Sequence, residues 1–288
     1  MKYAYFPGCS LHSTALDYDE SARAVAKALD VELVEVPDWT CCGASPAHVT
    51  NTFLSLSLPL KNLQSAEKIS RQMVVFCAAC YSRFKFAEKS LAENQIKEKI
   101  KKIINLEDIP EVKTRHFLDI LINEIGLENV QNRKKQDLKG IKVACYYGCL
   151  LIRPPKVAEF DDPEQPSCLD NLVEILGAVP VSWPYKNECC GASLSLSRTD
   201  IVLKLTNDIL QDASEAGAEC LVVACPLCQA NLELRQKDIN KKYRKDFSLP
   251  VFYFTQLLGL ALGIDKKSLG LHRAMVSGDF LLKEKGIA

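Results

Sequence analysis

Ten cysteines form two copies of one pattern, and their type and spacing suit them to chemistry. Each copy has a cysteine after a glycine, then an adjacent cysteine pair followed by glycine, then a Cys-x-x-Cys loop. The spacing repeats to the residue, because 35 positions separate Cys42 from Cys77 (77 − 42) and Cys190 from Cys225 (225 − 190). The first cysteine set is Cys9, Cys41, Cys42, Cys77 and Cys80, and the second is Cys149, Cys189, Cys190, Cys225 and Cys228.

Thiolates in this arrangement favour metal binding. A Cys-x-x-Cys loop is shared by zinc sites, iron–sulfur sites and metal-free dithiols, so it does not decide among them. Adjacent Cα atoms lie ~3.8 Å apart, and two vicinal thiolates rarely both fit one tetrahedral ion. Five thiolates also exceed the four that close a structural zinc site or a cubane cluster. The pattern therefore favours an iron–sulfur cluster in each set, with zinc in one or both sets and metal-free dithiols as alternatives.

Three polar side chains are weak candidates for roles beside the cysteines. His12 and His48 follow cysteines of the first set and would serve as proton donors, while Lys186 precedes the second cysteine pair and would steer an anionic substrate. With His116 and His272, the histidines show no metal-ligand spacing, so surface or satisfied histidine is the plainer interpretation of each. The sequence thus predicts no specific catalytic side chain, and the chemistry is expected to reside on the clusters.

Composition limits the remaining possibilities. The 288 residues allow two domains, and equal numbers of basic and acidic side chains, 36 each, argue against nucleic-acid binding. The start of the chain does not resemble a signal peptide. The longest apolar stretch, residues 251–264, is shorter than the ~20 residues of a membrane span and predicts core or a docking helix. Thirteen cysteines without such signals indicate a reducing, cytoplasmic location. The three cysteines outside the repeat predict buried core positions: Cys145, Cys168 and Cys220.

Strands and helices alternate in both halves, which predicts an α/β fold with two tandem, internally duplicated domains of mainly parallel strands, each carrying one Cys-Cys-Gly (CCG) motif. The polar, basic stretch near residues 128–140 predicts a linker, with an N-terminal CCG domain at 1–132 and a C-terminal CCG domain at 133–288. Cysteines directly follow expected strands, at the sheet edge where ligands bind in open α/β sheets. Long helices are expected at 52–72, where Pro59 would kink the helix or open its second half, and at 81–104.

The repeated pattern resembles the cysteine-rich CCG domain, and the whole chain resembles the B subunit of heterodisulfide reductase. Besides the cysteines, the matching stretches are residues 144–149, 160–164, 225–232 and 253–258. The resemblance implies two non-cubane [4Fe-4S] clusters, one held by each cysteine set. It further implies an oxidoreductase acting on a sulfur group, in methanogenesis or another anaerobic energy metabolism, with any membrane contact made through partners.

In that family the substrate is the mixed disulfide of coenzymes M and B, which is reduced to two thiols between the clusters. The implied partners resemble the C subunit of that complex, a small protein with cubane clusters, and its A subunit, a flavoprotein. We expect the two clusters to meet across the domain interface with a substrate cleft between them. Two other interpretations stay open: an electron-relay protein that passes electrons from such partners to a quinone or flavin, and a zinc-stabilised interaction protein.

Overall fold

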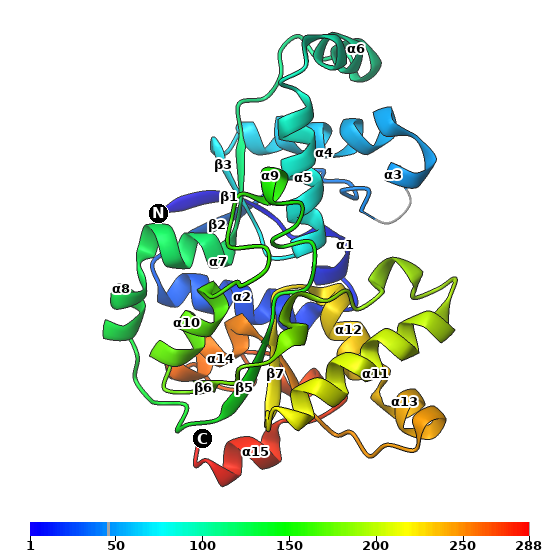
Figure 1. Ribbon diagram of the computed structural model, residues 1–288. Coiled ribbons are helices and arrows are strands. Elements are labelled where there is room, and N and C mark those ends of the chain that lie inside the picture. Colours follow the sequence, from blue (N-terminus) through cyan, green and yellow to red (C-terminus); the bar gives the residue numbers. More distant parts are fainter. Residues whose placement is uncertain (45–46, 288) are drawn as a thin grey trace.

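The computed structural model describes residues 1–44 and 47–287, and its backbone is organised around two four-stranded parallel sheets (Figure 1). The strand orders are β2-β1-β3-β4 and β6-β5-β7-β8, which are the same order repeated. This repetition confirms the predicted fold of two tandem, duplicated α/β units with parallel sheets. The strands are β1 Lys2–Phe6, β2 Glu32–Glu35, β3 Gln72–Val75, β4 Lys113–His116, β5 Lys142–Tyr146, β6 Val179–Pro180, β7 Cys220–Val223 and β8 Val251–Tyr253.

Helices connect the strands, as parallel pairing requires. The α-helices are α1 Gly8–Leu11, α2 Leu16–Ala28, α3 Ala47–Thr50, α4 Thr52–Glu67, α5 Ala78–Ser90, α6 Asn94–Ile104, α7 Phe117–Ile120, α8 Leu127–Asn132, α9 Pro155–Ala158, α10 Cys168–Ile175, α11 Thr199–Glu215, α12 Pro226–Leu234, α13 Gln236–Tyr243, α14 Phe254–Ala261 and α15 Asp279–Glu284. The other helical segments are the π-helix η1 Leu121–Ile125 and the 3₁₀ helices η2 Pro184–Asn187, η3 Ala192–Leu194 and η4 Leu271–Arg273.

Two predicted helices differ from the structure. The single helix expected at 81–104 is wrong, because α5 ends at Ser90 and α6 begins at Asn94 after the extended residue Glu93. The physical reason is burial: α5 packs much of its length in the core, whereas α6 buries only Ile100 and projects from the body (Figure 1). Helix α4 contains Pro59 but continues to Glu67, so the proline does not open a separate helix.

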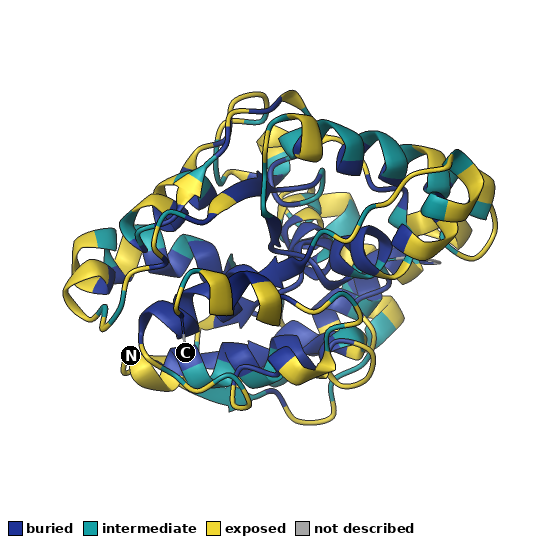
Figure 2. Cartoon of the chain, turned by 90° about the horizontal axis from the view of Figure 1, so that it is seen from below, coloured by how far each residue is buried: buried dark blue, intermediate teal, exposed yellow. Residues whose placement is uncertain are grey.

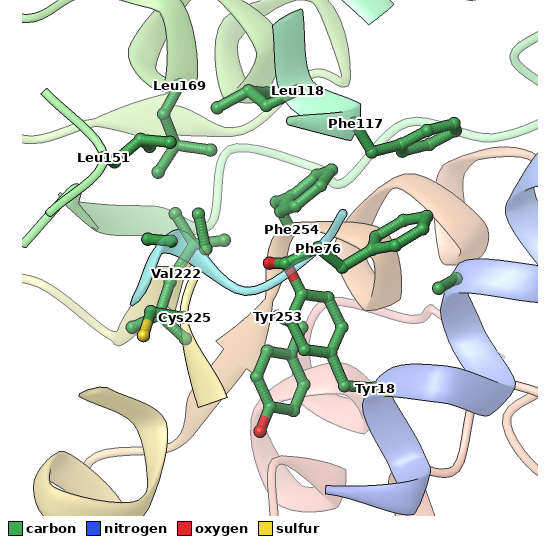
Figure 3. Close-up of a cluster of buried hydrophobic side chains, with 14 of the residues drawn as sticks. Tyr18, Phe76, Phe117, Leu118, Leu151, Leu169, Val222, Cys225, Tyr253 and Phe254 are labelled. Carbon is green, nitrogen blue, oxygen red and sulfur yellow. The ribbon is translucent and has the colours of Figure 1, made fainter. Parts of the chain in front are cut away.

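The two halves share one hydrophobic core. Helix α14 of the second half packs against α2 of the first, and the Oγ of Ser21 lies 2.7 Å from the Oγ1 of Thr255 across the boundary. Beside this contact the rings of Tyr18 and Tyr253 stack with centroids 3.8 Å apart, as Figure 3 shows. All of α14 is buried, which confirms the core prediction for the apolar stretch of the second half. Figure 2 shows buried segments of the sheets and of several helices meeting inside the molecule.

A second contact between the halves joins α5 and α9. Helix α9 packs against α5, where the hydroxyl of Tyr81 donates to the carbonyl of Ala158 over 2.5 Å. Helix α8 ends at Asn132 and β5 starts at Lys142, and the domain boundary between residues 132 and 133 stays a prediction. In the part of the chain that the structure describes, no helix has the length and apolarity to cross a membrane.

Candidate functional site

The sheet topology gathers the cysteines of each set. Cys9 lies in α1 directly after β1, and Cys77 is the N-cap of α5 after β3. Cys149 follows β5 and Cys225 is the N-cap of α12 after β7, so the second half repeats the arrangement. Because parallel strands end at the same edge of a sheet, these cysteines converge on one edge in each half. The adjacent cysteine pairs are carried by the loops that follow β2 and η2.

In the first cysteine set, neighbouring thiols contact one another. The sulfur atoms of Cys42 and Cys80 lie 3.2 Å apart. Cys77 is close enough to Cys80, and Cys42 to Cys41, to raise the pKa of that thiol. Cys9 is close enough to Cys41 to influence its ionisation. Five sulfur atoms thus lie in one neighbourhood, as a polynuclear cluster would require.

The second cysteine set has the same internal contacts with small differences. The sulfur atoms of Cys190 and Cys228 lie 3.6 Å apart, and Cys228 is hydrogen-bonded to Cys225. Here Cys149 lies close enough to Cys189, the first member of the adjacent pair, for each thiol to shift the pKa of the other. Both sets therefore bring the second cysteine of the pair onto the last cysteine of the Cys-x-x-Cys loop.

The two sets meet at the boundary between the halves. Cys77 and Cys225 lie close enough for each thiol to shift the pKa of the other, and both residues are buried. Figure 3 shows Cys225 beside the aromatic cluster formed by residues of both halves. The expected approach of the two sites across the interface is therefore present in the structure. The cleft for a substrate between them stays a prediction.

Interactions between neighbouring thiols raise the pKa of one partner and lower that of the other. The pKa of Cys42 lies well below its usual range because Cys41 and Cys80 hydrogen-bond to it, and the pKa of Cys225 is lowered likewise by Cys228 and Cys77. A hydrogen bond from Cys149 lowers the pKa of Cys189 to about 6. Since thiolates are the metal-binding form, each set contains a thiol whose pKa is shifted toward this form.

Glycines keep the backbone close to the sulfur atoms. Gly8 and Gly148 have φ of +69° and +65°, and a Cβ added there would lie 3.2 Å from the sulfur of Cys80 and 3.1 Å from that of Cys228, respectively. A side chain at either position would be strained and would crowd the cysteines. In the CCG loops, the amides of the glycines donate to Cys41 over 3.4 Å and to Cys189 over 3.3 Å. Such N–H···S contacts tune the potentials of iron–sulfur clusters.

The remaining cysteines are structural. Cys145, Cys168 and Cys220 are all buried, as predicted, and burial raises the pKa of each. Within residues 1–44 and 47–287, no three His, Cys, Asp or Glu side chains have the arrangement that would hold a single metal ion.

The weak catalytic candidates have different surroundings. Lys186 makes an ion pair with Asp170 at 2.9 Å, and its carbonyl accepts from the amide of Tyr147 over 2.7 Å, just before Cys149. His12 pairs with Glu35 at 3.0 Å, and His48 is exposed on α3. Lys186 therefore lies beside the loop of the second set. Its role in steering an anionic substrate stays a prediction, as do the proton-donor roles of the two histidines.

His116 is a satisfied histidine, as the plainer interpretation predicted, but the sequence did not reveal its place between the two cysteine sets. It is fully buried, and its Nε2 lies 2.9 Å from the carbonyl oxygen of Phe76 and 3.3 Å from that of Ala224, the residues directly before Cys77 and Cys225. The signal available in the sequence was its position at the end of the fourth strand of the first half, at the edge where the cysteines gather. Its contact with Ala224 depends on packing between the halves, which no local pattern reveals.

Fold and site together define a class of protein with two duplicated α/β units. Each unit carries five cysteines at one edge of its sheet, and the two cysteine sets lie next to each other where the units meet. The CCG cysteine-rich domain model matches residues 3–85 and 143–233, one match in each half. The membrane anchor subunit of the 8-methylmenaquinol:fumarate reductase of Wolinella succinogenes is 31% identical over 96% of this chain and 97% of its own length. The B subunit of the ferredoxin:CoB-CoM heterodisulfide reductase of Methanosarcina mazei is 30% identical over 98% of this chain and 96% of its own length.

The chain therefore belongs to the cysteine-rich CCG-domain family that includes the B subunit of heterodisulfide reductase. A protein of Archaeoglobus profundus that is itself named for its likeness to this B subunit is 28% identical over 93% of both chains. A solved structure of a hypothetical protein from Helicobacter pylori has the same fold, with a TM-score of 0.75 at 13% identity. This chain is covered over 96% of its length and spans about half, 52%, of that one.

Proposed function

We propose that this chain is the iron–sulfur subunit of a heterodisulfide-reductase-like complex, an oxidoreductase acting on a sulfur group, and that it reduces a small-molecule disulfide to two thiols. The observation that carries the proposal is the contact between the two cysteine sets at Cys77 and Cys225. Breaking a disulfide takes two electrons, whereas an iron–sulfur cluster exchanges one at a time. Two adjoining sites on one chain would supply both electrons at one place.

The residues present fit a non-cubane [4Fe-4S] cluster in each set. The donors are all thiols, five in each half, and the amides of the CCG glycines point to sulfur. Both members of each adjacent cysteine pair contact other thiols of their set, which suits a centre with several irons. When bound, the clusters would supply the electrons. The chain would hold them close together and keep solvent from their buried side, where Cys77, Cys80, Cys225 and Cys228 lie.

The outer side of each site is the direction from which substrate and electron donors would approach. Cys9, Cys41 and Cys189 are exposed, in contrast to the buried loop cysteines. A mixed disulfide such as that of coenzymes M and B, the substrate class named for the Methanosarcina relative, fits this proposal. Electrons would come from a small partner with cubane clusters, similar to the C subunit of heterodisulfide reductase, and a flavoprotein similar to its A subunit would supply them. The cytoplasmic location is part of the same proposal.

A second function is favoured by one observation. The Wolinella relative, at 31% identity over nearly the full length, is named as a component of a quinol:fumarate reductase rather than of a disulfide reductase. In an electron relay of that kind, the same two sites would pass electrons between a partner and a quinone or flavin. Both functions use the adjoining cysteine sets and differ in the final reaction partner.

The test starts with the iron, acid-labile sulfide and zinc content of anaerobically purified protein, where the proposal expects about eight irons and eight sulfides per chain, two clusters of four. The reduced protein is then mixed with the coenzyme M–coenzyme B disulfide, and separately with a quinone. Oxidation by the disulfide with release of two thiols supports the reductase, whereas oxidation by the quinone alone supports the relay. Zinc without sulfide would overturn both.

A matched pair of variants shows whether the cysteine sets are responsible. Cys225→Ser removes a thiol of the second set, and Cys220→Ser changes a buried cysteine outside both sets, five positions earlier in the same strand–helix unit. The first variant is expected to lose iron and thiol release, and the second to keep both. Equal losses of iron and thiol release in the two variants would show that these properties do not depend on the cysteine sets.

A further inference from the structure

One buried ring nitrogen contacts both halves at equivalent points. Nε2 of His116 lies 2.9 Å from the carbonyl oxygen of Phe76 and 3.3 Å from that of Ala224. Phe76 and Ala224 hold the same place in the repeat, directly before the Cys-x-x-Cys loops of their halves. His116 therefore joins the two loop starts through a single side chain.

The other ring nitrogen determines where the proton resides. Nδ1 of His116 accepts from the amide of Leu118 over 3.3 Å, which leaves the proton on Nε2. An Nε2–H group facing two carbonyl oxygens donates to both. Complete burial lowers the pKa of His116 to about 4, so the ring is neutral at physiological pH. The hydroxyl of Tyr18 adds a second donor to the Phe76 carbonyl over 2.8 Å.

The two carbonyls lie beside the contact between the cysteine sets. Cys77 and Cys225 are the N-caps of α5 and α12, and their thiols lie close enough for each to shift the pKa of the other. A donor that holds the preceding carbonyls thus holds the starts of both loops relative to each other. The position equivalent to His116 in the second half is Tyr253, since each pairs with the last residue of the preceding strand of its sheet. Tyr253 instead stacks on Tyr18, so one histidine serves both halves.

We propose that His116 is a positioning residue that sets the separation of the two cysteine sets by hydrogen-bonding the backbone of both halves at once. The inference rests on the proposed function, because it requires a cluster in each set. His116 acts through the carbonyl groups of Phe76 and Ala224. Its measurable consequence is the magnetic coupling between two reduced clusters, which depends strongly on their separation.

The experiment compares reduced holoprotein of the wild type and of three variants by electron paramagnetic resonance. His116→Leu removes the donor at similar size, whereas His116→Gln places an amide N–H near the position of Nε2. Ser21→Ala removes a buried hydrogen bond that also joins the halves, to Thr255, and leaves the groups that donate to Phe76 and Ala224 in place. We expect the spin-coupling splitting to be lost in His116→Leu and kept in His116→Gln and Ser21→Ala.

Iron content separates failure of the inference from failure of the proposed function. Fewer than two clusters in the wild type would overturn the proposed function and this inference with it. Two clusters with no coupling, or with the same coupling in His116→Leu, would overturn the inference alone. If His116→Leu does not fold, His116→Asn replaces it, because its shorter amide does not reach both carbonyls. Equal coupling in the Asn and Gln variants would then count against the role of His116.

Discussion

The two halves carry identical cysteine spacing but surround it with different polar side chains. Arg83 and Asn231 occupy equivalent positions, three residues after the last cysteine of each loop. Asn231 donates to the carbonyl of Cys190 over 3.0 Å and so holds the second CCG loop. The guanidinium of Arg83 lies over the ring of Phe86 instead. Burial lowers the pKa of Arg83, and attraction to Cys42 opposes this effect.

The difference shows that duplication kept the cysteines of each set but not the charges around them. The first site has a half-buried positive charge near its thiols, whereas the equivalent side chain in the second site is a neutral amide. The strand ends differ as well, because His116 bridges the halves and Tyr253 does not. We therefore expect two clusters with the same ligand set and different potentials, which suits an ordered transfer of two electrons.

The largest expected effect comes from breaking one ligand set at a time. Cys42→Ser and Cys190→Ser should each lower the iron content by about four atoms per chain, because each removes one thiolate from one cluster. Iron and sulfide analysis of both variants measures this. Cys168→Ala, in a buried cysteine outside both sets, should keep the full content. Complete loss of iron in either Ser variant would mean that the halves do not bind metal independently.

Acid sensitivity should distinguish His116 from Tyr253. In the unfolded chain His116 takes up a proton as the pH falls below its ordinary pKa of 6.5. In the folded chain burial lowers this pKa to about 4, so the ring stays neutral until the pH is that low. The folded state thus loses stability as the pH falls through this window, by roughly 3 kcal/mol from this residue. In urea unfolding at pH 7 and pH 4.5, His116→Gln should lose less stability on acidification than the wild type. Tyr253→Phe should behave like the wild type, and an unchanged pH dependence in His116→Gln would contradict the assignment.

The charge difference between the sites is tested at Arg83. Arg83→Asn gives the first site the amide of the second, and removing a nearby positive charge disfavours the reduced, more negative cluster. We expect one of the two potentials to fall by ~40 mV, which corresponds to about 1 kcal/mol for one electron. Redox titration followed by electron paramagnetic resonance measures the shift. Arg83→Lys retains the charge and is the control, and a fall of the same size there would exclude a charge effect.

The smallest effect concerns the support of the second CCG loop. The hydroxyl of Tyr146 donates to the carbonyl of Glu188 over 2.6 Å, directly before Cys189, whereas the last residue of β1 is Phe6 and lacks a hydroxyl. Tyr146→Phe should cost about 1 kcal/mol of unfolding free energy, as measured by urea denaturation. Iron content should stay unchanged. A loss of iron from this variant would show that the hydroxyl is needed for metal binding.

Much of the architecture was predictable from the sequence. The paired spacing of the cysteines, together with apolar segments of strand length before them, predicted duplicated parallel sheets with cysteines at their carboxyl edges. These inferences succeed because strand periodicity and glycine turns act over a few residues. They are less reliable for helix ends, as the break between α5 and α6 shows. There, packing against the rest of the chain, and not local propensity, decides where the helix stops.

The sequence by itself determined which residues form each cysteine set and that two duplicated α/β units carry them. Only the tertiary structure decided that Cys77 meets Cys225, that α14 packs on α2, and that His116 bridges the two loop starts. These contacts join residues more than 100 positions apart, so they depend on how the buried faces of two halves fit together. Shape and burial across such an interface are collective properties of many side chains, which spacing along the chain does not encode.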